Sequence, residues 1–123
     1  PMVLLHGNGG SIGSRANLIP EFASRYRVIA FDSRCHGKSD CPQGYLTYEQ
    51  MASDIQATLT HLKVDSAYIW GQSDGGIIGL LMAIHYPEKV KKLLASGANL
   101  RPDTTAFDPA LLPMMDKMWA VVK

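Results

Sequence analysis

The sequence predicts an α/β fold, a three-layer sandwich in which helices cover both faces of a central parallel sheet of about four strands. Short apolar runs alternate with longer segments of helical periodicity, which is the pattern of repeated βαβ units. The first apolar run, residues 2–5, lacks polar alternation, as is typical of a strand that is buried on both faces. Hydrophobic residues make up 46% of the 123 residues, and this fraction excludes a disordered chain.

Four apolar runs are the predicted strands, at residues 2–5, 27–31, 67–70 and 90–95. A glycine-rich turn follows the first run, and the third run stops at Gly71. Because strands that alternate with helices pair in parallel, we expect these runs to form one sheet.

Helices are predicted in the three segments between these strands. Ser14 is expected to cap a short first helix, and Thr47 with Gln50 forms the capping-box pattern that opens the second. The second helix carries one apolar stripe, made of Met51, Ile55, Leu59 and Leu62. The third helix is expected at residues 74–86, ending before Pro87.

Composition and charge exclude several classes of protein. No apolar run approaches the roughly 18 to 20 residues that a membrane-spanning helix needs. The 12 basic and 11 acidic residues, a net charge of +1, carry no electrostatic signature of nucleic-acid binding. Cys35 and Cys41 have no metal-ligand spacing, so we expect reduced thiols and a cytoplasmic location.

The chain opens with Pro1 inside an apolar run and does not begin with methionine. Because chain termini are usually frayed surface segments, we expect that an N-terminal part is missing. The sequence therefore leaves open whether a signal peptide precedes this segment.

The segment Gly71-Gln72-Ser73-Asp74-Gly75 lies between a predicted strand and a predicted helix and matches the GxSxG nucleophile elbow. On such a turn Ser73 projects its hydroxyl into a cleft, while the flanking glycines leave room for the backbone. The following helix directs free amide groups toward the same place, so the N–H of Asp74 is the expected oxyanion donor. The alternative is an ordinary Gly/Ser turn, but the strand before it and the helix after it favour the elbow.

A second glycine-rich loop, at residues 6–10, is the expected source of another oxyanion donor. Its glycines allow the backbone to approach a substrate closely. The amide of Asn8 is the first candidate and that of Gly9 the second. The alternative is a simple glycine turn, and the elbow farther along the chain favours the functional interpretation.

A third segment, residues 32–39, reads Asp-Ser-Arg-Cys-His-Gly-Lys-Ser. In this order the three motifs resemble the α/β-hydrolase fold family, and the Ser-Asp-Gly-Gly run is similar to that of its biphenyl-hydrolase-like and valacyclovir-hydrolase group. The resemblance implies an acyl-enzyme on Ser73, with no metal or organic cofactor, and a scaffold role for Asp32 and Arg34. It also implies a sheet in which the second strand flanks the first, followed by the third and fourth. Cys35 departs from the glycine usual in the family.

The resemblance also implies a catalytic acid and a histidine later in the chain, in that order. Beyond Ser73 the only histidine is His85, and a helical rise of roughly 18 Å puts it too far away to accept the proton of Ser73. We therefore expect a fragment without the C-terminal part of such an enzyme. Residues 1–100 would be a partial hydrolase core, and residues 101–123 the start of its cap, with a Met-rich helix at 111–122.

The expected function is a serine hydrolase that acts on a small carboxylic ester or related acyl compound. One alternative is a catalytically incomplete fold fragment without turnover. A Rossmann-type dinucleotide-binding domain is another, disfavoured because Ile12 stands where its fingerprint needs glycine. Since the outer strands would lack neighbours, we also expect self-association through exposed sheet edges.

Overall fold

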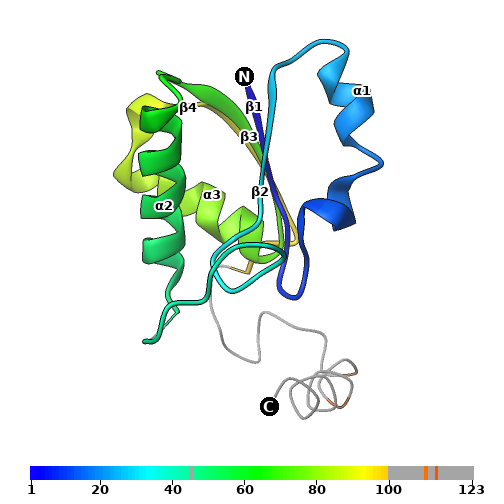
Figure 1. Cartoon of the computed structure of the whole chain (residues 1–123), viewed down its shortest axis with the longest axis vertical. Coiled ribbons are helices and arrows are strands. Elements are labelled where there is room, and N and C mark those ends of the chain that lie inside the picture. Colours follow the sequence, from blue (N-terminus) through cyan, green and yellow to red (C-terminus); the bar gives the residue numbers. More distant parts are fainter. Residues whose placement is uncertain (45, 100–109, 111–112, 114–123) are drawn as a thin grey trace.

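The computed structural model describes residues 1–44, 46–99, 110 and 113. At its centre is a four-stranded sheet in the order β2-β1-β3-β4 (Figure 1). The strands are β1 (Met2–Leu5), β2 (Val28–Phe31), β3 (Ala67–Gln72) and β4 (Val90–Ser96). All three pairings are parallel, so the predicted fold class and the predicted strand order are both confirmed.

Helices cover both faces of the sheet, which produces the three predicted layers (Figure 1). The long helices α2 (Tyr48–His61) and α3 (Asp74–His85) pack together on one face. The short 3-10 helix η1 (Ile12–Arg15) and helix α1 (Ile19–Ala23) cover the other face. A second 3-10 turn, η2 (Pro87–Lys89), leads from α3 into β4.

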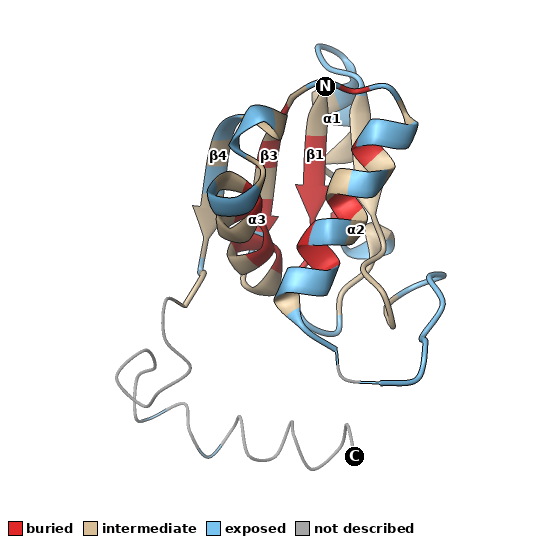
Figure 2. Cartoon of the chain, turned by 90° about the vertical axis from the view of Figure 1, so that its left-hand side faces the viewer, coloured by how far each residue is buried: buried red, intermediate tan, exposed pale blue. Residues whose placement is uncertain are grey.

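The main hydrophobic core lies between the sheet and the layer formed by α2 and α3 (Figure 2). Val3 and Leu5 of β1 are fully buried there, and burial of such a side chain contributes roughly 1.5–3 kcal/mol. The cluster also contains Met51, Ala52, Ile55, Leu59, Val64, Ala67, Ile69, Ile78 and Met82. The predicted apolar stripe of α2 therefore faces the sheet, with Leu62 at the margin of the core.

Aromatic side chains fill the opposite interface, under α1. The ring of Phe22 packs edge-on against Trp70 with centroids 5.5 Å apart, and Tyr26 meets Tyr68 at 5.7 Å. The guanidinium of Arg15 lies 5.5 Å from the centroid of the Trp70 ring. Both faces of β3, the strand that leads into the candidate site, are thus packed.

The helix caps agree with prediction in one place and differ in another. Thr47 caps α2, because its hydroxyl accepts the N–H of Gln50 at 3.2 Å. The expected cap at Ser14 is wrong, since Ser14 lies inside η1, whose N-cap is Ser11. α1 begins only after Leu18, with a proline in its first turn, where the missing N–H of proline costs no hydrogen bond.

Two further expectations concern the remainder of the chain. No helix among the described residues is both long and apolar enough to cross a bilayer. The predicted cap region, residues 101–123, and its Met-rich helix lie outside the described residues, except for Ala110 and Pro113.

Candidate active site

Ser73 forms the junction between β3 and α3, and its backbone adopts φ 52° and ψ −120°. β3 continues past its expected end at Gly71 to Gln72, so the turn into the helix is abrupt. A left-handed conformation costs a residue with a side chain about 1–3 kcal/mol. The N–H of Ser73 donates to the carbonyl of Ser96 at 2.8 Å, and its own carbonyl accepts the N–H of Gly76 at 2.8 Å. Neighbouring backbone thus holds the strained turn in place.

Glycines let three backbone segments meet around this turn. A Cβ at Gly71 would overlap the carbonyl oxygen of Gly75. A Cβ at Gly75 would lie 2.5 Å from the carbonyl oxygen of Leu5, and one at Gly76 would lie 2.9 Å from the Cβ of Ala98. No side chain fits at these distances. Glycine at these positions therefore allows the start of α3 to pack directly on the end of β1 and on the segment after β4.

The loop after β1 reaches the same place. A Cβ at Gly7 would lie 3.1 Å from the Cβ of Ser73 and 3.8 Å from its Oγ. The next two residues are Asn8 and Gly9, and Gly9 turns the chain with φ 68°. Within the described part of the chain, the N–H groups of Asn8 and Asp74 have no acceptor. The structure therefore brings the predicted site residues together at the carboxyl ends of the strands, where open α/β sheets bind ligands.

The side chain of His6 holds this loop in place through two hydrogen bonds. It is only 2% exposed, its Nδ1 donates to the carbonyl of Gly7 at 2.8 Å, and its Nε2 accepts the N–H of Ser33 at 3.0 Å. The ring of His36 lies 5.1 Å away from it. Because both ring nitrogens of His6 are engaged, this histidine positions the loop and does not serve Ser73 as a base.

Asp32 organises the turn at residues 32–39. Its carboxylate accepts the N–H of Lys38 at 2.9 Å and that of Ile12 at 2.6 Å, and these hydrogen bonds hold the pKa of the Asp32 carboxyl below its usual value. A Cβ at Gly37 would overlap the carboxylate, so the motif needs glycine there. These are the contacts of a scaffold residue, since they tie the turn to η1.

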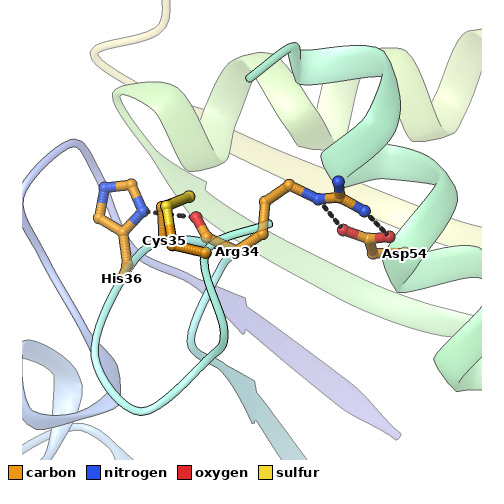
Figure 3. Close-up of a disulfide and its surroundings, with 5 residues drawn as sticks. Arg34, Cys35, His36 and Asp54 are labelled. Atoms are coloured by element: carbon orange, nitrogen blue, oxygen red, sulfur yellow. Dashed lines mark hydrogen bonds and ion pairs between the residues drawn. A yellow bond between two sulfur atoms is a disulfide. The ribbon is translucent and has the colours of Figure 1, made fainter. Parts of the chain in front are cut away.

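Cys35 and Cys41 form a disulfide within this turn (Figure 3). The prediction of reduced thiols is therefore wrong. The chain brings the two cysteines together because the N–H of Cys35 donates to the carbonyl of Asp40 at 3.0 Å, which closes the loop next to Cys41. Beside the disulfide, Arg34 forms a bidentate ion pair with Asp54 of α2, at 2.6 and 2.7 Å, and so joins the turn to the helix (Figure 3).

A contact between Tyr48 and Asp74 is a feature that sequence patterns did not indicate. The hydroxyl of Tyr48 donates to Oδ1 of Asp74 at 3.0 Å. Burial, followed by this hydrogen bond, raises the pKa of Tyr48 to about 12. The two residues begin α2 and α3, and no local pattern could have found the contact because it arises only when the helices pack.

No general base faces Ser73 within the described residues, where its hydroxyl forms no hydrogen bond. His85 lies at the far end of α3, with its ring 6.4 Å from that of Tyr86. The same residues contain no group of three His, Cys, Asp or Glu side chains that could hold a metal ion. A shallow pocket of about 360 Å³ lies between Arg34, Cys41 and their neighbours, and not at Ser73.

Comparison with known proteins agrees with this geometry. The sequence profile of a family described as "alpha/beta hydrolase fold" matches residues 1–120. The chain is 32% identical over 95 residues to 3-oxoadipate enol-lactonase 2 of Acinetobacter baylyi, which covers 77% of this chain and 36% of that protein. It is 37% identical over 95 residues to epoxide hydrolase 4 of Mus musculus, which covers 76% of this chain and 26% of that protein.

One solved structure is similar over the whole length of the chain. A structure described as a marine microorganism esterase superposes with a TM-score of 0.87 at 28% identity, and the match covers 100% of this chain and 46% of that one. The chain thus spans 36% and 26% of the length of the two curated relatives and less than half of the esterase.

Proposed function

We propose, because this chain belongs to the α/β-hydrolase fold family, that the whole protein is a serine hydrolase that cleaves carboxylic esters or related acyl compounds through an acyl-enzyme on Ser73. The observation that supports this most directly is the left-handed Ser73 between β3 and α3, with the Gly7 loop beside its hydroxyl. Strained backbone of this kind persists where the surrounding structure enforces it, and it is concentrated at functional sites.

In the proposed reaction the Oγ of Ser73 attacks the carbonyl carbon of the substrate while a general base takes the hydroxyl proton. The electron pair of the carbonyl bond moves onto oxygen, and the N–H groups of Asp74 and Asn8 bind this oxyanion, with Gly9 as the alternative donor. The positive end of α3 adds to the stabilisation. The alcohol then leaves with a proton, and water hydrolyses the acyl-enzyme.

The general base in this proposal is a histidine oriented by a carboxylate. The described residues do not provide such a pair at Ser73, so we place it in another part of the whole protein. We accordingly propose that the 123-residue chain alone has no ester turnover above background. An isolated serine hydroxyl is a weak nucleophile, and loss of a triad member removes most of the catalytic rate.

The substrate class is proposed from the site and not from the relatives. The two relatives are named as an enol-lactonase and an epoxide hydrolase, which are enzymes of different reactions. Two free amide donors beside a serine suit any substrate that develops an oxyanion, which favours a small ester or another acyl compound. The proposed chemistry uses no metal and no organic cofactor.

A fluorophosphonate probe tests the assignment of Ser73 in the whole protein. We expect covalent labelling of the wild type and its complete loss in Ser73→Ala, because the probe reacts only with an activated serine. Ser53→Ala is the matched control, since Ser53 is an exposed serine on the surface of α2. Labelling of Ser73→Ala at the wild-type level would show that the nucleophile lies elsewhere.

The cytoplasmic location remains a prediction, and one of the expectations behind it, reduced cysteines, is wrong. Reduced cysteines would favour the cytosol, but Cys35 and Cys41 form a disulfide, and disulfides are rare there. Cell fractionation with the native protein decides the question. Recovery in a secreted or periplasmic fraction would contradict the prediction.

A further inference from the structure

We infer that Tyr48 is a positioning residue of the proposed reaction, which holds the carboxylate of Asp74 so that its negative charge does not oppose the oxyanion. This inference rests on the proposed function. Tyr48 in α2 and Asp74 in α3 are 26 residues apart in sequence, and their contact lies directly beside the nucleophile.

The contact lies at the start of α3. Asp74 is the residue after Ser73 and the first residue of α3, and its N–H is one of the two proposed oxyanion donors. The same residue therefore carries a group that would stabilise the transition state and a carboxylate that would destabilise it. Two negative charges close together in a half-buried site repel each other more strongly than they would in water.

The carboxylate of Asp74 accepts a hydrogen bond from Tyr48. Within the described residues, Asp74 forms no ion pair, and the single salt bridge there joins Arg34 to Asp54. The partner that the structure provides is the hydroxyl of Tyr48, which donates to Oδ1 at 3.0 Å. A hydrogen bond to a charged group is about twice as strong as one between neutral groups, so it fixes the orientation of the carboxylate and offsets part of its charge.

The hydroxyl is also anchored and protonated. Tyr48 directly follows the Thr47 cap, and the start of α2 is fixed by that cap. The phenol keeps its proton throughout the neutral range, since its pKa lies near 12. Tyr48 can therefore act as a donor at every pH at which a serine hydrolase works, without taking part in proton transfer itself.

Tyr48→Phe in the whole protein tests the inference. Phenylalanine keeps the ring and removes only the donor, so we expect kcat to fall about tenfold, less than the 10²–10³ lost with an oxyanion donor itself, with KM changed less than twofold. Rates are expressed per fluorophosphonate-reactive site. A purely structural role would lower the number of such sites and leave kcat per site unchanged. Tyr86→Phe, at the other end of α3, is the matched control, because its hydroxyl forms no hydrogen bond within the described residues.

Tyr48→Phe in an Asp74→Ala background distinguishes an effect of Tyr48 that acts through Asp74 from a direct effect of Tyr48 on the reaction. In Asp74→Ala there is no carboxylate to hold, so adding Tyr48→Phe should change kcat less than twofold. An equal tenfold loss in both backgrounds, or unchanged kcat per site in Tyr48→Phe, would overturn the inference. The proposed function fails separately, if Ser73→Ala retains activity.

Discussion

At the residue scale, Cys35 is bonded to Cys41 in a disulfide. It occupies the position where the similar family usually has glycine. Cys35 adopts φ 64°, a conformation that costs L-residues roughly 1–2 kcal/mol and that glycine adopts freely. The disulfide to Cys41 keeps this residue in place. The departure from the family pattern therefore leaves the turn with a left-handed residue and adds a cross-link to it.

Removing the cross-link should lower stability in a way that glycine partly repairs. For a loop as short as residues 35–41, chain entropy predicts a contribution of about 2 kcal/mol from the disulfide. We expect Cys41→Ser to lose about this much in the free energy of unfolding by urea. Adding Cys35→Gly should recover about 1 kcal/mol.

The control for this experiment is reduction. Dithiothreitol should lower the stability of the wild type to that of Cys41→Ser and should leave the variant unchanged. Equal stability of the wild type with and without the reductant, with complete reduction shown by thiol titration, would contradict the prediction.

At the element scale, the turn at residues 32–39 connects the sheet with two other segments. Asp32 binds the N–H of Ile12 in η1, and Arg34 binds Asp54 in α2. The turn also supports the candidate oxyanion loop, because the N–H of Ser33 donates to His6. The stability of this turn therefore affects the geometry beside Ser73.

Asp32 makes that stability depend on pH. Its carboxyl has a lowered pKa in the folded state, so its contribution is present above the unfolded pKa of about 3.9 and is lost as pH falls through the folded value. Asp32→Asn should be less stable than the wild type by about 1–2 kcal/mol at pH 7. The difference should shrink as thermal melts are carried from pH 4 downward. Asp40→Asn, whose carboxylate forms no hydrogen bond in the described structure, is the control and should follow the wild type throughout.

Elements and motifs were predictable to the extent that they depend on neighbouring residues. Short, mainly apolar runs predicted all four strands, and the cap at Thr47 lies where its pattern indicates. The expected cap at Ser14 is wrong because the 3-10 helix η1 already begins at Ile12, with Ser11 as its N-cap. The disulfide and the contact of Tyr48 with Asp74 depend on loop closure and helix packing, which local patterns do not encode.

At the scale of the whole molecule, the sheet has two outer strands, β2 and β4. Within the described residues neither is paired on its outer side. β4 exposes Leu94, with 58% of its surface accessible, together with Lys91 and Lys92. Lysines on an edge strand oppose pairing with another chain, whereas an exposed leucine favours association.

We predict that the 123-residue chain self-associates through these edges. Light scattering at micromolar concentration should give a mass above that of the monomer. Leu94→Lys should shift the mass toward the monomer, because a charge replaces the exposed apolar side chain on the edge. Lys63→Gln, in the exposed turn after α2, is the control and should leave the mass unchanged. A monomeric wild type would contradict the prediction.

The order in which the chain folds follows from the contacts that hold Ser73. Its N–H is bound by Ser96, and Gly75 abuts the carbonyl of Leu5, so segments from both ends of the described core must come together before the turn can close. Contacts between residues so distant in sequence form late, because loop-closure entropy has to be overcome first. A chain with an incomplete sheet therefore lacks the contacts that hold the strained backbone of Ser73, and the geometry of this turn requires the finished sheet.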